Sequence, residues 1–339
     1  MRGKMPFLFI ACLLAISIMI GGCTSMQNQM VTTTGKYPDK PIMIIVPFTA
    51  GGGVDLAARA LTKSAIKHLG QPLVVVNKPG GTGVVGWNEL ASSNPDGYTI
   101  GMAEVELLLH PLYDSTKYNY PTALEPLCQI SSIPLLLVIK ADQPWQNVNE
   151  LVNYARQHPG ELKFSHTGIG SLNHILGESL AHSTGIKLKQ VPFQGGSELL
   201  TALLGGHVQI AILSPALVKE HLKNGTVRVL AIASDRRLTD PVFSNVPTFK
   251  EQGLDIVFSN SWGIAVPKEL PIEVKTKLTN GLELIITDPE FKKDMENLGV
   301  NVEYLGPKES QELWITESKK LTKALQETGI VDLIKSQKQ

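Results

Sequence analysis

The chain has 339 residues, with 31 basic and 31 acidic side chains and therefore no formal net charge. A balanced chain of this length is not expected to bind nucleic acid and usually forms two domains. The only cysteine beyond residue 23 is Cys128, so a chain processed at its N-terminus can form no intramolecular disulfide. Cys128 lies near apolar residues and is expected to pack in the core. The sequence has no CxxC pair, His/Cys cluster or HExxH motif, so we expect no metal and no cofactor.

The N-terminal segment predicts export. Basic residues precede the apolar run 7–20, which is too short to span a bilayer and is typical of a signal-peptide core. The run ends in Ile20-Gly21-Gly22-Cys23, the pattern of a bacterial lipoprotein cleavage site. We therefore predict a lipoprotein signal peptide over residues 1–22, a lipid on Cys23 and a polar tether over residues 23–36. An ordinary secretory signal with an incidental cysteine is the alternative.

Cleavage after residue 22 would leave 29 basic and 31 acidic residues, a formal net charge of −2. The mature protein would then be extracytoplasmic, in the periplasm or on the outer face of the cell membrane, and anchored by the lipid on Cys23. The slight negative charge again argues against nucleic acid as a partner.

Strands and helices alternate from residue 42 onward. The strand 42–46 leads through a glycine-rich turn into a helix whose apolar face ends at Gly70. Further strands are predicted at 73–76 and 98–102, with a helix at 87–91 between them. This alternation indicates an α/β fold with a mainly parallel sheet.

A second block of the same kind begins near residue 133, where the apolar run Ile133–Ile139 predicts a buried strand. Ser171 is expected to be the N-cap of the helix that follows it. Apolar spacing and turn residues predict further helices at 145–158, 172–180, 198–204, 217–222, 272–286, 290–298 and 310–327, and strands at 162–164, 188–191, 208–213, 227–233, 256–258 and 263–266.

Three loops share one design, in which a strand ends, glycines follow and a helix begins: residues 47–55, 165–171 and 192–197. Such a turn directs unpaired N–H groups and the positive end of a helix dipole at one point, where an anion can bind. Ligands bind at the carboxyl ends of the strands in open α/β sheets, so we expect the three loops to face one ligand across a cleft. None of the loops contains an arginine, which favours recognition by dipoles.

An enzyme fits these motifs poorly. The glycines at 51–53 are not part of GxxxxGK[ST], and GxSxG is absent, so neither a P-loop nor a nucleophile elbow is predicted. Ser171 and His174 lie close together at one helix start, but no orienting acid accompanies them. We therefore expect a binding protein without catalytic residues. A ligand-sensing receptor for a two-component signalling system would use the same binding lobes, and the sequence does not separate it from a transport receptor.

The order of the motifs resembles that of the tripartite tricarboxylate transporter receptors, the Bug or TctC-type extracytoplasmic solute-binding proteins. The resemblance covers about residues 37–330, and its specificity lies in the order of the motifs. They are Tyr37-Pro38-Asp39-Lys40-Pro41-Ile42, Val46-Pro47-Phe48 with Gly51-Gly52-Gly53, Asp55 and Ala58-Arg59, Leu69-Gly70-Gln71-Pro72, Asn77-Lys78-Pro79-Gly80-Gly81 with Gly83 and Gly86, Pro95-Asp96-Gly97-Tyr98-Thr99, Gly168-Ile169-Gly170-Ser171 with His174, Pro192-Phe193-Gln194-Gly195-Gly196, Gly205-Gly206-His207-Val208, and Ser261-Trp262-Gly263 with Pro267.

The resemblance implies a two-lobed periplasmic-binding-protein fold, type II-like, in which mostly parallel sheets flanked by helices enclose a ligand cleft. Lobe 1 would comprise residues 37–136 and 258–339, and lobe 2 residues 137–257. Receptors of this kind close on a small organic anion, commonly a carboxylate, and deliver it to the membrane permease subunits of a tripartite transporter. A monomer is expected.

The same resemblance implies that twelve residues contact the ligand, largely through main-chain groups. They are Ala50, Gly51, Gly52, Gly53 and Asp55 on one side and Thr167, Gly168, Ser171, His174, Phe193, Gly195 and Gly196 on the other. One departure is Ser214-Pro215, which stands where relatives often carry an acidic or amide residue. It removes a side chain that could read an amino group on the ligand.

Three side chains near these loops have two interpretations each. Asp55 either caps its own helix or receives a ligand N–H or a bridging water, because a carboxylate beside an anion site needs intervening water. His174, one turn into a helix, is explained at least as well by a structural hydrogen bond as by a ligand contact. Trp262 precedes a glycine and is expected to pack in the cleft or to act at a hinge.

Overall fold

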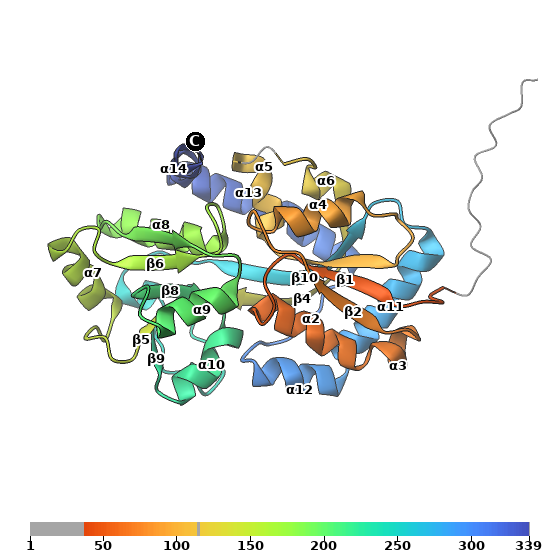
Figure 1. Ribbon diagram of the computed structural model, residues 1–339, viewed down its shortest axis with the longest axis horizontal. Coiled ribbons are helices and arrows are strands. Elements are labelled where there is room, and N and C mark those ends of the chain that lie inside the picture. The colour runs from red at the N-terminus through yellow and green to blue at the C-terminus, as the bar shows by residue number, and fades with distance from the viewer. Residues whose placement is uncertain (1–36, 114–115, 339) are drawn as a thin grey trace, which may run out of the picture. The chain divides into compact units, whose positions relative to one another are not determined.

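Two five-stranded sheets organise the part of the chain that the structure, a computed structural model, describes, residues 37–113 and 116–338 (Figure 1). Residues 38–339 form one compact unit. The predicted signal peptide, the tether and the lipid site at Cys23 lie outside the described residues. None of the described helices is both long and apolar enough to cross a membrane.

The first sheet contains the predicted N-terminal strands. Its order is β2 (Leu73–Asn77), β1 (Ile42–Val46), β3 (Thr99–Ala103), β10 (Ser259–Pro267) and β4 (Leu124–Pro134). β1 pairs in parallel with β2 and β3, and Ile44 lies opposite Val75 and Ile100. β10 runs antiparallel to both β3 and β4, so the other four strands point the same way. This agrees with the mainly parallel sheet that the sequence predicts.

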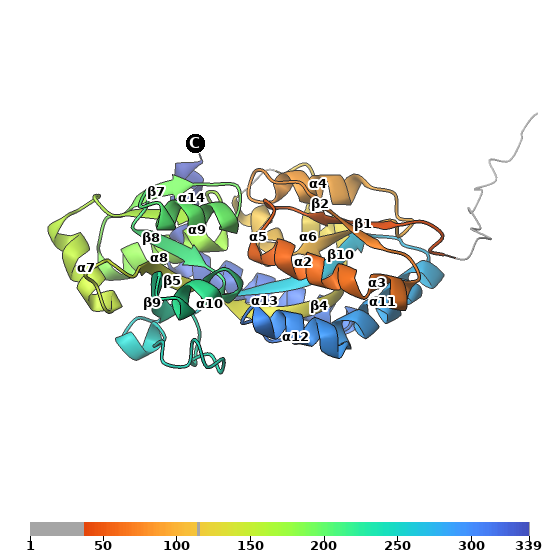
Figure 2. The ribbon, with the colours of Figure 1, turned by 60° about the horizontal axis from the view of Figure 1, so that its bottom comes forward.

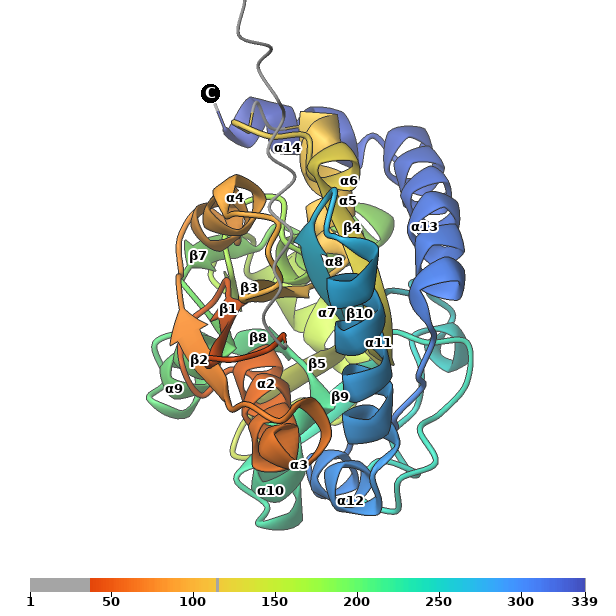
Figure 3. The same ribbon diagram turned by 90° about the vertical axis from the view of Figure 1, so that its right-hand side faces the viewer.

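Amphipathic helices cover this sheet because their apolar faces need burial. α2 packs on β1 and β2, α4 on β1 and β3, and α11 and α13 on β4. α4 and α13 lie at opposite sides of the view in Figure 3, and α12 lies in front in Figure 2, where it packs on α2 and α11. The helices of this part are α2 (Gly53–Lys63), α3 (Ala65–Leu69), α4 (Val84–Ser92), α5 (Glu106–Tyr113), α6 (Tyr120–Ala123), α11 (Ile272–Thr287), α12 (Pro289–Asn297), α13 (Pro307–Glu327) and α14 (Ile330–Gln337).

The second sheet repeats the same plan. Its order is β7 (Lys189–Pro192), β6 (Lys163–His166), β8 (Ile210–Leu213), β5 (Leu136–Lys140) and β9 (Val227–Ile232). β6 is parallel to β7 and β8, and β5 is antiparallel to β8 and β9, so again one strand opposes the other four. Its helices are α7 (Val148–Gln157), α8 (Leu172–Thr184), α9 (Gly196–Leu204) and α10 (Pro215–Lys223), with a short 3₁₀ turn, η1 (Lys250–Gln252).

Each sheet with its helices forms one lobe, called here the first lobe and the second lobe. The chain leaves the first lobe after β4 and returns to it at β10. The two crossings touch, because the Leu135 N–H donates to the Phe258 carbonyl at 3.4 Å. The Phe258 N–H in turn donates to Ala233, next to β9. The described residues therefore form the two-lobed α/β fold that the resemblance implies, with paired crossings between the lobes.

The structure corrects the predictions near these crossings. The run Ile133–Ile139, predicted as one buried strand, is divided between two sheets, since β4 ends at Pro134 and β5 begins at Leu136. Residues 256–258, predicted as a strand, precede β10 and belong to none. Leu135 and Ile256 lie where the chain changes sheets and are buried without continuing a ladder, whereas Val257 and Phe258 are partly exposed.

The first predicted helix is also interrupted. It breaks at Ser64, so α2 ends at Lys63 and α3 follows, and Gly70 closes α3 in the left-handed conformation with φ of 82°. The N-cap predicted at Ser171 is confirmed, because its hydroxyl accepts from the His174 N–H. Cys128 is buried as expected, and burial raises the pKa of its thiol to about 12.

Candidate functional site

The turn between β1 and α2 is held in shape by Asp55. The carboxylate of this fully buried residue accepts hydrogen bonds from the Gly51 N–H at 2.8 Å, from Arg59 at 2.8 and 3.1 Å, and from the Asn77 amide at 2.9 Å. Burial alone would raise the pKa of Asp55, but the bonds from Arg59, Gly51 and Asn77 outweigh it and lower the pKa below its usual value. The carboxylate reaches back from the first turn of α2, so it braces the glycine-rich loop.

A loop of the second lobe contacts this turn directly. The hydroxyls of Thr49 and Ser197 lie 3.2 Å apart, and Ser197 donates to the Ala50 carbonyl at 3.0 Å. A Cβ added to Gly195 would lie 2.0 Å from the Thr49 Oγ1. Only a residue without a side chain allows the two loops to approach this closely. Three of the predicted residues, Ala50, Gly51 and Gly195, thus lie where the lobes meet.

A cavity of about 60 Å³ lies between the lobes, at the carboxyl ends of strands from both sheets. Gly52 and Gly53 line it from the first lobe, and Thr167 and Gly196 from the second. One buried water needs about 10–15 Å³ of such volume, so this cavity can hold a few waters or a small ligand. The structure therefore brings together four predicted residues, which come from all three predicted loops, around one cavity.

Helix N-termini surround the cavity. α2 begins at Gly53 and α9 at Gly196, and neither helix has a side-chain cap on its first N–H groups. α10 begins after Ser214, which also lines the cavity. The first N–H groups of a helix have no partner within it, and the helix dipole adds a positive potential there. The cavity can thus hold a carboxylate through main-chain donors.

The remaining predicted residues lie around the cavity. Ser171 and His174 are fully buried in a network of the second lobe, where His174 Nδ1 accepts from the Gly170 N–H and its Nε2 lies 3.2 Å from the Gln190 Oε1. Gly168 and Phe193 line a separate open groove of about 1000 Å³, which Thr167 also borders. Asp55, Ser171 and His174 thus have described partners within the chain, and their contact with a ligand stays a prediction.

Two acids in the cavity wall, Glu104 and Glu106, were not among the predicted site residues. Glu104 follows β3 directly, and Glu106 begins α5. Both are almost completely buried, with exposed fractions of 7% and 2%. Burial raises the pKa of each, and the neighbouring Glu106 raises that of Glu104 further. Their place after a strand could have revealed them, because the carboxyl ends of parallel strands are where ligands bind.

Polar groups from other elements complete the wall. Asn260 on β10 donates to Glu104 at 3.0 Å, and the indole N–H of Trp262, also on β10, is buried without a hydrogen-bond partner among the described residues. Asn173 and Ser214 line the cavity from the second lobe. Trp262 lies in the cleft, which agrees with its predicted packing role.

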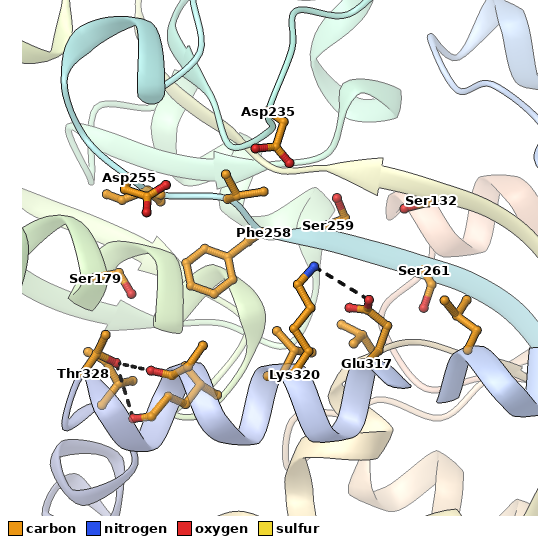
Figure 4. A pocket seen from close by; sticks show the side chains of 18 of the residues that line it. Ser132, Ser179, Asp235, Asp255, Phe258, Ser259, Ser261, Glu317, Lys320 and Thr328 are labelled. Atoms are coloured by element: carbon orange, nitrogen blue, oxygen red, sulfur yellow. Dashed lines mark hydrogen bonds and ion pairs between the residues drawn. The ribbon is translucent and has the colours of Figure 1, made fainter. Parts of the chain in front are cut away.

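A larger cavity of about 750 Å³ lies away from the glycine loops (Figure 4). Lys320 and Glu317 on α13 form an ion pair of 3.9 Å on one side, and Phe258 lies between α13 and the opposite wall. None of the twelve predicted residues lines this cavity. Among the described residues, no group of three or more His, Cys, Asp or Glu side chains is arranged to hold a metal ion.

Two lobes that enclose a small cavity with main-chain donors from both sides define a solute-binding protein of the periplasmic type. The chain belongs to the tripartite tricarboxylate transporter family receptors, whose family model matches residues 57–330. The resemblance inferred from the motifs is therefore confirmed. A Cupriavidus necator relative, "UPF0065 protein in gbd 5'region", is 30% identical over 297 residues, which are 87% of this chain and 89% of the relative.

Solved structures agree with this assignment. The periplasmic binding protein BugD has a TM-score of 0.82 and 28% identity, and the match covers 86% of this chain and 99% of BugD. An R. palustris protein solved with adipate has a TM-score of 0.81 and 26% identity, with 87% and 99% covered. MatC from Rhodopseudomonas palustris, solved with bound malate, has a TM-score of 0.75 and 25% identity, with 88% and 99% covered.

Proposed function

We propose that the protein is an extracytoplasmic solute receptor that captures a small carboxylate between its lobes and delivers it to a tripartite tricarboxylate-type permease. The observation that carries the proposal is the cavity lined by Gly52 and Gly53 from one lobe and by Thr167 and Gly196 from the other. The bound adipate and malate of two structural relatives support a carboxylate as the ligand class. The protein is not an enzyme on this proposal, since its family consists of receptors.

Binding would proceed by lobe closure. The N–H groups at the starts of α2 and α9 would donate to one carboxylate, and each charge-assisted hydrogen bond contributes about 1.5–3 kcal/mol. A few such bonds suffice for micromolar affinity. Because they come from different lobes, the ligand binds the closed form more tightly and shifts the population toward it. The paired crossings at Leu135 and Phe258 would act as the hinge.

The finer assignments belong to the same proposal. The twelve predicted residues would form the ligand site or its immediate support, and the lobes would be residues 37–136 with 258–339 and residues 137–257. A lipid on Cys23 would hold the monomeric receptor at the membrane, outside the cytoplasm. Mass spectrometry of the protein purified from a bacterial membrane would detect the lipid, and a Cys23→Ala variant released from the membrane would agree with it.

A thermal-shift screen of the purified protein against a panel of carboxylates tests the binding function. Ligand at about 100 times its dissociation constant adds about 2.7 kcal/mol to the free energy of unfolding, which raises the melting temperature by several degrees. A Gly52→Leu variant should lose this response while it still folds, because Gly52 has a φ of −71° and its side chain would enter the cavity. Gly52→Ala is the matched control, since its Cβ would make only ordinary contacts at 3.4 Å or more. Unchanged affinity in Gly52→Leu would contradict the site.

A further inference from the structure

Charge is distributed unevenly around the wall of the cavity between the lobes. Glu104 and Glu106 are its ionisable side chains, and none of its lining residues is basic. The helix N-termini of α2 and α9 supply partial positive charge at the glycine loops. One part of the cavity wall is therefore suited to an anion, and the wall formed by the two glutamates is suited to a hydrogen-bond donor or a cation.

Glu106 has one oxygen that no N–H or hydroxyl group of the described residues reaches. Its Oε1 accepts from the Leu172 N–H at 3.2 Å, while its Oε2 is buried without such a donor. The neighbouring Glu104 carboxyl hydrogen-bonds Glu106 when it holds a proton. The side chain of Glu106 is only 2% exposed. Even with a proton shared between the two carboxyl groups, the buried pair keeps one negative charge, and none of the residues lining the cavity is basic, so a cationic donor on the ligand would match this wall.

Glu104 is better satisfied. Its Oε2 accepts from the Asn260 amide at 3.0 Å. Burial and the neighbouring Glu106 raise the pKa of Glu104 well above its usual value. Burial also raises the pKa of Glu106, but hydrogen bonds from the N–H groups of Glu106 and Leu172 and from the Glu104 carboxyl oppose this effect. Of the two acids, Glu104 therefore holds a proton more readily than Glu106.

We propose that the cavity selects a carboxylate that also carries a protonated nitrogen, with its carboxylate on the N-termini of α2 and α9 and its ammonium donating to Glu106 Oε2. The inference rests on the proposed function and adds the second group of the ligand. A plain dicarboxylate would bring its second negative charge against the glutamate pair without a basic side chain in the cavity wall to balance it. A zwitterion matches both walls.

Isothermal titration of the full purified protein with matched ligands tests this inference. The probes are alanine, β-alanine and 4-aminobutyrate, each against propionate or butyrate, and aspartate against both succinate and malate. At least one amino compound should bind at least about tenfold more tightly than its nitrogen-free partner. Succinate or malate binding as tightly as aspartate, with no amino compound favoured elsewhere in the panel, would overturn the inference.

The variant Glu106→Gln tests whether Glu106 is the acid that binds the protonated nitrogen of the ligand. Glu106→Gln keeps an oxygen for the Leu172 N–H but removes the charge. The affinity for the amino ligand should therefore fall at least tenfold, while the affinity for its nitrogen-free partner stays the same or rises. Glu89→Gln is the matched control, because Glu89 lies in the same lobe and pairs with Lys78 at the surface. If the variant lost affinity for amino and plain carboxylates to the same extent, Glu106 would act in the contact between the lobes, and the inference would be overturned.

The outcomes separate this inference from the proposed function. If plain carboxylates bind and amino compounds show no advantage, the receptor function stands and the inference fails. If neither class raises the melting temperature or gives heat, both fail. The ligand comparison uses the unaltered protein, so a Glu106→Gln protein that did not fold would still leave the inference open to contradiction.

Discussion

Asp55 shows how a carboxylate can lie beside a turn that is predicted to bind an anion without repelling that anion. Its charge is matched by Arg59, and its remaining lone pairs are occupied by Gly51 and Asn77. The sequence analysis left open whether Asp55 caps its helix or meets the ligand. The observed bonds give it a role in shaping the turn, because it fixes the N–H of Gly51 just before the helix begins.

Asp55→Asn should lower the free energy of unfolding at pH 7 by about 2–3 kcal/mol, since hydrogen bonds to a buried charge would be lost. The folded-state pKa of Asp55 is lowered, so its contribution is present above about pH 4 and is lost as the pH falls through the folded-state pKa. Urea denaturation should show a smaller difference in the free energy of unfolding between Asp55→Asn and the unaltered protein at about pH 3 than at pH 7. Asp255→Asn, at an exposed ion pair with Lys250, should change little. Equal stabilities of the Asp55→Asn and unaltered proteins at pH 7 would contradict the bracing role.

Gly195→Ala should weaken ligand binding at least about tenfold, or about 1.4 kcal/mol. The added Cβ would lie 2.0 Å from the Thr49 Oγ1 and 2.9 Å from the Thr49 nitrogen, so the lobes could not close fully. Gly195 has an extended backbone with φ of −176°, and alanine adopts it without strain. The melting temperature without ligand should therefore change little. A normal affinity measured by titration would show that closure does not need this contact.

Some residues of the candidate site could be predicted from their residue type and position, and others could not. Glycines that end a strand and open a helix were informative, because backbone donors are fixed by chain geometry, and four of the twelve predicted residues line the cavity. Side chains were less predictable. His174 and Asp55 find partners within the chain that only the folded structure reveals, and Glu106 gains its Leu172 partner from the other lobe.

At the scale of elements, two buried histidines join β6 to α8, since His166 ends β6 and His174 lies in the first turn of α8. The rings of His166 and His174 lie 4.8 Å apart, and the Nδ1 atoms accept from Gly168 and Gly170. Burial lowers the pKa of His166 to about 4, and burial together with His166 lowers that of His174 to about 3. Both rings are therefore neutral in the folded protein at neutral pH.

The two histidines should make the protein less stable as the medium becomes acidic. Their folded-state pKa values lie below the unfolded value of about 6.5, so their contribution is present above that pH and is lost as the pH falls toward 4. Each should account for about 2 kcal/mol between pH 7 and pH 5. Denaturant midpoints measured at pH 7, 6 and 5 should fall less steeply with decreasing pH for His174→Gln than for the unaltered protein. His207→Gln, at an exposed site, serves as the control. An unaltered slope in His174→Gln would contradict this account. The comparison between variants matters because the raised pKa values of Glu104 and Glu106 act in the opposite direction.

Elements with a clear period were predictable, and elements at the crossings were not. The strands β1 and β2 and the helix α2 follow simple apolar patterns bounded by glycine. β4 contains buried Gln129 and Ser131 and ends in a proline, so its pattern does not look like a core strand. The Gln129 amide donates to the Glu303 carbonyl and the Ser131 hydroxyl to the Asn301 carbonyl. These partners lie far away in sequence and could not be assigned in advance.

At the scale of the whole molecule, the proposed function requires the lobes to separate and close around the ligand. Thr49→Cys with Ser197→Cys should report it, because the two hydroxyl oxygens lie 3.2 Å apart. An oxidised double variant should take up no ligand until a reductant is added, since the disulfide would hold the lobes together. The buried Cys128 should not compete, because burial raises the pKa of its thiol to about 12.

Each single variant is the control for this measurement and should bind ligand normally under oxidising conditions. Non-reducing electrophoresis and mass spectrometry would verify the bond within one chain. Rapid ligand uptake by the oxidised double variant would show that binding does not require the lobes to separate.

The position of β10 between β3 and β4 also sets an order of assembly. The second lobe is one continuous segment between the two crossings, whereas the sheet of the first lobe lacks its fourth strand until residues 259–267 have emerged. During synthesis or export, β3 and β4 would each expose an unpaired edge while the second lobe already had all its strands. The late strand thus directly follows the proposed hinge and is the last strand to join the first sheet, so a nascent chain would acquire a foldable second lobe before it could form a cleft.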